Sequence, residues 1–232
     1  MALVGTLKGA RRTPSHLRSV NHLGKLLGIG VTRDMNVGHP LKSLNRSPLS
    51  LSNSEIKRVG LSLSTKCTVN IDALTWFETL DLDDTFFSWF KVVELHVWMV
   101  SLRLLQDPSS EMNEVFFSIQ NSLIEAIWNE AHNRIGSVGV KGRKRNNYLS
   151  GLSNQLRIAF LLYDDGVLGS DIRLANALWE GFFNKRDDIS VEQLSRMVEY
   201  VRQNLLMLEK LESSNIAIKQ NFSWTSIKNI SS

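Results

Sequence analysis

The sequence predicts an all-α protein: a compact helical domain of about six helices preceded by a disordered N-terminal leader. Apolar residues recur every three or four positions through most of the chain from residue 72 onward. Alternation with a period of two, which indicates strands, is absent from this region. Capping residues precede several of the periodic segments, and the connections between them are short, which implies neighbouring helices that pack antiparallel or at steep angles.

The first two expected helices are a short one near 72–80 and a long one over 84–106. The long segment is apolar almost throughout, which is the composition of a central, nearly buried helix. Within it, Lys91 and Glu94 stand at the i,i+3 spacing of helical neighbours. Pro108 follows, and proline cannot continue the ladder of backbone hydrogen bonds, so we expect the helix to end just before it.

Four more periodic segments follow along the chain. The first covers about 111–135, where Gly136 provides a stop signal, and the second covers about 145–164. A third begins after Ser170, an N-capping residue followed by an acidic residue in the first turn. The fourth begins with the capping box Ser190–Gln193.

Composition excludes several classes of protein. With 43% hydrophobic and 22% charged residues among 232, the chain is a globular one that can bury a substantial core. It has no apolar run of about 18 residues, so no membrane-spanning helix is expected. The single Cys67 excludes an internal disulfide, and the five histidines, His96 and His132 among them, lack ligand spacing, so we expect no structural metal and no cofactor.

Positive charge is concentrated near the N-terminus. Residues 1–58 contain ten Lys/Arg and two acidic residues. Residues 1–33 contain no acidic residue and combine arginine with serine, which is typical of an organelle import presequence. Residues 34–65, with many serines and two prolines, are interpreted as a linker without a core. We therefore expect the helical domain, with a C-terminal tail, to occupy residues 66–232.

The stretch Asp81-Leu-Asp-Asp-Thr85 fits the Asp-x-Asp-x-Thr pattern of phosphatases that attack phosphate with an aspartate. In that interpretation Asp81 is the nucleophile, Asp83 is the general acid/base, and a magnesium ion lies between them. A second acidic pair, Asp164-Asp165, could help to hold the metal. The nucleophile of such enzymes follows a buried parallel strand, however, and the apolar spacing over 71–80 is helical. We therefore expect a helix start here and keep the magnesium-dependent phosphatase as the alternative function.

Four cations lie within five residues just before an expected helix: Lys141, Arg143, Lys144 and Arg145. Positive charge is unfavourable at a helix N-terminus, so local structure does not explain this run. It could contact RNA phosphates or anionic lipid head groups, which would make the chain an RNA- or membrane-surface adaptor. The competing interpretation is an ordinary solvated loop.

Several sequence blocks occur in a fixed order along the chain: 84–90, 95–99, 163–166, 174–183, 198–202 and 222–224, with Asp171 between them. Together these blocks resemble the ubiquinol–cytochrome c chaperone family, and the resemblance covers roughly residues 70–225. The residues taken as the family motif, with a structural or partner-binding role, are Asp84, Trp89, His96, Trp98, Tyr163, Asp164, Asp165, Gly166, Asp171, Leu174 and Trp179.

The resemblance implies a mitochondrial assembly factor of the cytochrome bc1 complex that has no catalytic residues. It implies that the protein binds newly made cytochrome b together with a small helical partner assembly factor, near the mitochondrial ribosome. It further implies a peripheral location on the matrix side of the inner membrane, and the presequence-like leader agrees with that compartment.

The block that begins at Tyr163 also has a physical interpretation of its own. Gly166 and Gly169 permit a tight reversal between two helices. We expect this corner to be structural and to hold Trp179 against Tyr163. Carboxylates near the corner are expected to accept backbone N–H bonds, namely those of Asp164, Asp165 and Asp171.

Overall fold

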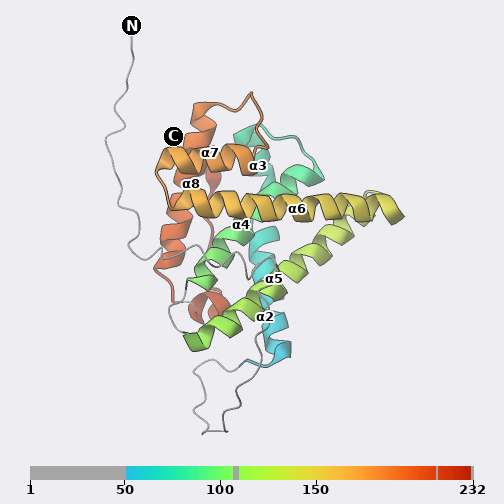
Figure 1. The fold of residues 1–232 in the computed structure, drawn as a ribbon, viewed down its shortest axis with the longest axis vertical. Helices are drawn as coiled ribbons and strands as arrows, with labels where there is room; N and C mark the ends of the chain where they lie inside the picture. Colours follow the sequence, from blue (N-terminus) through green and yellow to red (C-terminus); the bar gives the residue numbers. More distant parts are fainter. Residues whose placement is uncertain (1–50, 107–109, 213, 231–232) are drawn as a thin grey trace, which may run out of the picture.

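The computed structural model describes residues 51–106, 110–212 and 214–230, and this part of the chain is helical without any strand. The α-helices, shown in Figure 1, are α2 (Asn53–Thr68), α3 (Ala73–Leu80), α4 (Phe86–Leu105), α5 (Ser110–Ser137), α6 (Gly142–Val167), α7 (Asp171–Gly181) and α8 (Val191–Glu209). A π-helical turn (Asn215–Lys219) and a 3-10 turn (Ile227–Asn229) follow. The prediction of an all-α fold is confirmed.

Helix α4 is the central element, as its apolar composition predicted. Every residue from Trp89 to Ser101 is buried, and α4 packs against α2, α3, α5, α6 and α8. The helix begins at Thr85, the N-cap, whose side-chain oxygen accepts the backbone N–H of Ser88 at 3.2 Å. Because α4 is enclosed on all sides, polar groups within it must find partners inside the protein.

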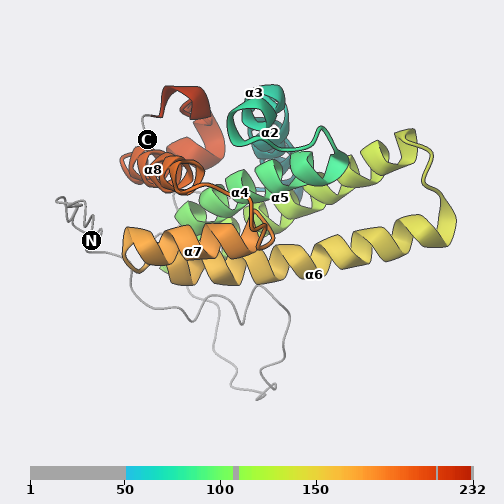
Figure 2. The same cartoon turned by 90° about the horizontal axis from the view of Figure 1, so that it is seen from above.

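Helices α5 and α6 are joined by a reversal whose tip extends beyond the other helices in both views (Figures 1 and 2), and the two helices diverge from this tip in Figure 1. Gly139, with φ +85°, and Gly142, with φ +59°, adopt the left-handed conformation at this tip. Side chains with a Cβ rarely adopt that conformation, so glycine suits both positions of the reversal. Helix α7 then lies alongside α6 (Figure 2).

Helix α2 corrects the expected domain boundary. The linker was expected to continue to residue 65, but α2 begins at Asn53, and its Leu63 and Cys67 are fully buried. Ser52 and Glu55 form a capping box at its start. Buried positions four residues apart make one face of the helix, and small residues between them allow close packing on α5. Serines that suggested a linker therefore belong to a packed helix.

The C-terminal segment after α8 returns to α2 and α3. The indole N–H of Trp224 donates to the carbonyl of Lys66 at 2.8 Å, and the Lys66 ammonium donates to the carbonyl of Phe222 at 3.0 Å. No helix among the described residues is long and apolar enough to cross a membrane. The expected presequence 1–33 and the linker residues up to 50 lie outside the described residues.

Candidate functional site

The aspartate stretch 81–85 joins two helices and has no strand before it. Asp81 is the C-cap of α3, in the left-handed conformation with φ 50°, and Thr85 rather than an aspartate caps α4. The second acidic pair, Asp164 and Asp165, lies within α6. No group of His, Cys, Asp and Glu in the described ranges could hold a metal ion. The geometry that the phosphatase alternative requires is not present at these residues, so that alternative is not supported.

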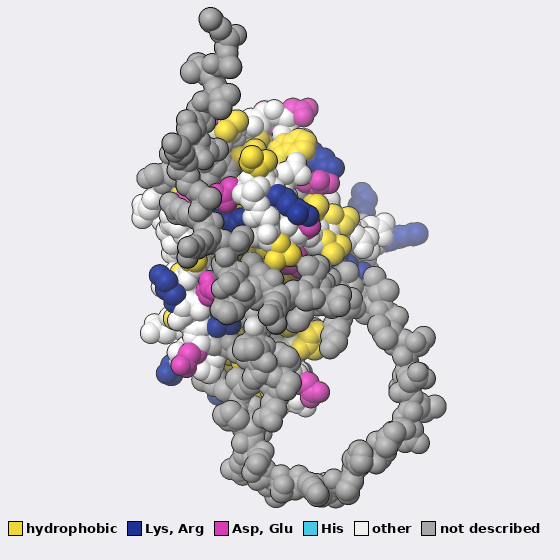
Figure 3. All heavy atoms as spheres, turned by 60° about the vertical axis from the view of Figure 1, so that its left-hand side comes forward, with side chains coloured by type: hydrophobic (Ala, Val, Ile, Leu, Met, Phe, Trp, Pro, Cys, Tyr) yellow, Lys and Arg dark blue, Asp and Glu magenta, His cyan; other side chains and the backbone are white. Residues whose placement is uncertain are grey.

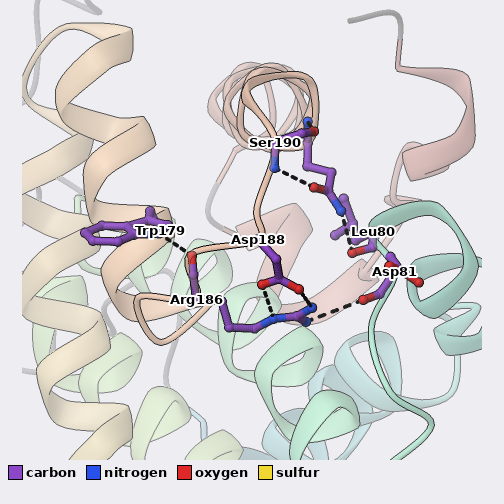
Figure 4. Close-up of polar contacts among 7 residues, drawn as sticks. Leu80, Asp81, Trp179, Arg186, Asp188 and Ser190 are labelled. Atoms are coloured by element: carbon purple, nitrogen blue, oxygen red, sulfur yellow. Dashed lines mark hydrogen bonds and ion pairs between the residues drawn. The ribbon is translucent and has the colours of Figure 1, made fainter.

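Residues 182–190 hold the end of α3 in place, as Figure 4 shows. The guanidinium of Arg186 donates to the carboxylate of Asp188 at 2.6 Å and to the carbonyl of Asp81 at 3.4 Å. The side-chain amide of Gln193 donates to the carbonyl of Leu80 at 2.8 Å. The carbonyl groups that end α3 are therefore satisfied from the loop before α8 and from the first turn of α8, which fixes these two helices relative to each other.

A buried ion pair lies where α4 meets α6 and α7. The Lys91 ammonium donates to the carboxylate of Glu94 at 3.0 Å and to the carbonyl of Gly181 at 2.9 Å. The hydroxyl of Tyr163 donates to the same carboxylate at 3.2 Å. Burial raises the pKa of Glu94 to about 7, even though Lys91 and Tyr163 act in the opposite direction. Desolvation therefore outweighs the attraction of the ammonium.

A second buried polar group lies further along α4, at His96. Its Nδ1 is 2.7 Å from the carbonyl of Val92, which can only accept, so Nδ1–H donates and Nε2 accepts from the hydroxyl of Tyr200 at 2.7 Å. Burial lowers the pKa of His96 to about 4. The rings of Trp76 and Trp224 contact the imidazole edge-on, at centroid distances of 5.2 and 4.6 Å. His96 is therefore a neutral core residue that connects α4, α3, α8 and the C-terminal segment.

An open pocket of about 130 Å³ lies beside this aromatic group. Two exposed apolar side chains, Val69 and Leu74, neighbour in sequence the residues that form one of its walls. The pocket unites three segments that are distant in sequence, and it was not predicted. Its lining consists of Asn70, Ile71, Asp72, Thr75, Trp76, Tyr200, Trp224, Thr225, Ser226 and Ile227.

The corner between α6 and α7 is held by side-chain donors. The indole N–H of Trp98 donates to Asp164 at 2.8 Å, and the guanidinium of Arg173 bonds the carboxylate of Asp165. Arg202, on α8, donates to Asp171 at 3.2 Å. The sequence predicted that backbone N–H groups would donate to these carboxylates. Instead, α6 continues to Val167, so Asp164 and Asp165 lie inside a helix and not in a loop. The backbone N–H groups of a helix already have partners.

Close backbone approach explains the glycine at 166. A Cβ there would lie 2.6 Å from the Cβ of Ala177, so the glycine lets α7 pack directly on α6. Tyr163 was expected to pack on Trp179, but its ring partner is Trp98 at 5.2 Å. The indole N–H of Trp179 instead donates to the carbonyl of Arg186 at 2.8 Å (Figure 4).

We expect Arg202→Met to destabilise the corner more than Asp171→Ala. Arg202 donates to the carbonyls of Val167 and Gly169 at 2.9 and 3.0 Å, which end α6, and these acceptors lose their donor in the variant. The loss should be about 2 kcal/mol of unfolding free energy. Asp171 is mostly exposed, so its truncation should cost about 1 kcal/mol or less. Urea denaturation of both variants checks the order, and equal losses would contradict it.

Comparison with known proteins identifies the family. The family model described as "Ubiquinol-cytochrome C chaperone" matches residues 78–224, from the end of α3 through α8 to Trp224. The chain belongs to the ubiquinol–cytochrome c chaperone family. The resemblance inferred from the sequence blocks is therefore confirmed.

Relatives of this family member include proteins named ubiquinol–cytochrome c reductase complex assembly factor 1. The Drosophila melanogaster protein is 35% identical over 155 residues, which are 66% of this chain and 59% of the relative. The human protein is 31% identical over 179 residues, 76% of this chain and 57% of the relative. Protein CBP3, mitochondrial, of Saccharomyces cerevisiae is 29% identical over 150 residues, 61% of this chain and 42% of the relative. The match thus spans under 60% of the length of each of these relatives.

The fold agrees with a solved structure. The crystal structure of the Cbp3 homolog from Brucella abortus superposes with a TM-score of 0.59 at 10% sequence identity, covering 77% of this chain and 94% of that chain. At this identity the likeness concerns the fold alone.

The remaining family-motif residues fall on both core and surface. Leu174 is fully buried, and Trp89 is buried with the Arg134 guanidinium 4.2 Å from its ring centroid. Asp84 is exposed, in the turn before α4. The predicted basic run lies at the tip of the α5–α6 pair, where Lys141, Arg143 and Lys144 are exposed and Arg145 is half-buried.

Several residues of the buried network were not singled out as site residues from the sequence. Tyr200 and Arg202 lie in the family block 198–202, which was the signal that could have found them, whereas Trp76 has no local pattern that distinguishes it from other helical residues. Lys91 and Glu94 had a usable signal, because two charges inside an otherwise apolar helix must be paired when the helix is enclosed.

Proposed function

We propose that this chain is a non-enzymatic assembly factor for the ubiquinol–cytochrome c reductase complex. The observation that supports this is membership of the ubiquinol–cytochrome c chaperone family over residues 78–224, a range that includes α4 to α8. Relatives in fly and human are named assembly factors of that complex, and the yeast relative is named a mitochondrial protein. The buried polar network of α4 suits a scaffold, since its charged and imidazole groups are used in packing.

In its finer form, the proposal has the chain bind newly made cytochrome b together with a small helical partner. Binding takes place near the mitochondrial ribosome, with the chain peripheral on the matrix side of the inner membrane. The surface around the pocket suits the small partner best. Val69 and Leu74, which are next in sequence to residues that line the pocket, expose 72% and 63% of their surface. An apolar side chain of a partner helix can enter a pocket whose lining includes Trp76 and Trp224.

Affinity purification from mitochondria tests the proposal. The full chain with a C-terminal tag is recovered after labelling of mitochondrial translation products, and we expect cytochrome b and a small helical protein among the associated species. Recovery of neither would overturn the assigned function.

The double variant Val69→Asp/Leu74→Asp tests the proposed partner surface. It places two carboxylates on exposed positions next in sequence to the pocket lining, so we expect recovery of the small partner to fall at least about tenfold, since desolvating an unpaired charge is costly. The matched control is Val191→Asp, because Val191 is equally exposed (77%) but lies at the start of α8. An equal loss of the small partner in the double variant and in the control would contradict the proposed partner surface. The assembly role is tested separately, by the recovery of cytochrome b.

A further inference from the structure

The α5–α6 tip is unusual in charge. Between Glu130 and Asp164 the sequence contains no acidic residue, and it contains six Lys/Arg. Arg134 is paired with Glu130, whereas Lys141, Arg143 and Lys144 are exposed at the tip. On the face that Figure 3 presents, by contrast, acidic and basic side chains are interspersed over the described surface. The segment 131–163 therefore forms a zone of a single charge sign.

Apolar side chains are exposed in the same zone. Along α6, the solvent-facing stripe opposite the core runs through Asn147, Gly151, Asn154, Ile158 and Leu161, spaced by three or four residues. Ile158 and Leu161 on this stripe are 56% and 41% exposed. Val138, at the tip itself, is 68% exposed, and Tyr148 is exposed in the second turn of α6.

Protein stability does not explain this arrangement. Lys141, Arg143 and Lys144 lie at the N-terminus of α6, where the helix dipole disfavours cations. Aliphatic side chains that remain exposed to water contribute no hydrophobic stabilisation to the fold. The tip also extends beyond the other helices, so it can reach a flat surface without a clash (Figures 1 and 2).

We propose that the tip of the α5–α6 pair and the outer stripe of α6 dock on an anionic lipid membrane surface. Cations at the tip attract anionic head groups, and the exposed apolar side chains of the tip and of the outer stripe enter the boundary between head groups and acyl chains. The aliphatic residues decide between this partner and RNA, because phosphates attract the cations alone, whereas Val138, Ile158 and Leu161 gain only from an apolar phase. Among the exposed apolar side chains of this zone only Tyr148 offers an aromatic ring for base stacking.

The inference rests on the proposed function for the choice of membrane and deepens it by assigning a surface and a ligand class. Its test measures vesicle binding and does not involve complex assembly. A failed vesicle experiment therefore leaves the assembly role standing, and a failed purification leaves the docking surface standing.

The chain offers a site-specific probe. Its only cysteine, Cys67, is fully buried, and burial raises the pKa of its thiol, so it resists labelling. Full-length Val138→Cys and Ile158→Cys are labelled with a polarity-sensitive dye and mixed with phosphatidylcholine vesicles, with and without phosphatidylglycerol. We expect a blue shift at both positions only with the anionic lipid. Val191→Cys is the matched control and should not shift. No shift at 138 and 158, or an equal shift at 191, would overturn the proposal.

Charge reversal at the tip distinguishes lipid binding by this surface from lipid binding by the basic leader, because the leader is the same in all variants. Arg143→Glu/Lys144→Glu should weaken the dye response at residue 158 at least about tenfold in lipid concentration. The control Lys210→Glu/Lys219→Glu reverses two exposed cations elsewhere and should leave it unchanged. If the tip variant instead loses binding to an RNA oligonucleotide while the dye never responds to vesicles, the surface is an RNA site and the membrane proposal is wrong.

Discussion

Glu94→Ala is expected to lower the free energy of unfolding by about 3–5 kcal/mol, because it removes the buried acceptor that the Lys91 ammonium and the Tyr163 hydroxyl share. In this variant the Lys91 ammonium keeps only the carbonyl of Gly181 among its hydrogen-bond acceptors, and the Tyr163 hydroxyl loses the carboxylate to which it donates. Both residues are buried, so water does not replace what is lost. Urea denaturation at neutral pH measures the effect.

Glu94→Gln is the matched control, and comparison with it shows whether ionisation of Glu94 raises or lowers the unfolding free energy. Burial raises the pKa of Glu94 from 4.5 to about 7. A raised carboxyl pKa contributes stability that is present below pH 4.5 and is lost as the pH rises through 7. Glutamine mimics the protonated acid, so wild type and Glu94→Gln should be equally stable near pH 4.5. By pH 8 the unfolding free energy of wild type should have fallen relative to that of Glu94→Gln. If wild type instead becomes more stable relative to Glu94→Gln as the pH rises, the folded state favours the ionised carboxylate and the raised pKa is wrong.

The helices that the sequence predicted well have local signals at their ends. The long helix α4 was expected over 84–106 and runs from Phe86 to Leu105, because Pro108 limits it and its apolar run is longer than any strand. The capping box at Ser190 places the start of α8 at the following residue. Where capping and periodicity agree, the boundary follows from a few neighbouring residues.

Contacts between helices could not be predicted in the same way. The sequence paired Tyr163 with Trp179, in the last turn of α7, whereas the structure pairs it with Trp98 on α4. His96 and Tyr200 are 104 residues apart, and nothing near either residue indicates that they meet. Which side chains face each other depends on the angles at which α4, α6 and α8 cross, and periodicity defines only the buried face of each helix.

Helix α2 shows the limit of composition. Its serines and glycine are typical of a linker, yet its buried face of Val59, Leu63 and Cys67 is regular. Small residues beside that face permit a close helix contact that larger residues would prevent. A segment that looks too polar for a core can therefore be helical because its neighbour comes close enough to bury its backbone.

Gly60→Val tests this explanation and is the second change with a large expected effect. A Cβ at residue 60 would lie 2.6 Å from the Cβ of Ser122 and 2.7 Å from its backbone carbonyl carbon. A rotamer change at Ser122 cannot relieve contact with the backbone, so α2 must move away from α5. We expect a loss of about 3 kcal/mol, at the upper end of what overpacking costs.

The control Gly151→Ala separates this clash from a general effect of replacing a helical glycine. A Cβ at residue 151 meets nothing within 4 Å, so alanine there should raise the stability by about 0.5–1 kcal/mol through helix propensity alone. Opposite signs at the two glycines would show that α2 is held by its contact with α5. If Gly60→Val were harmless, α2 would not be packed on α5 as described, and the folded domain would begin after it, as the serine-rich composition suggested.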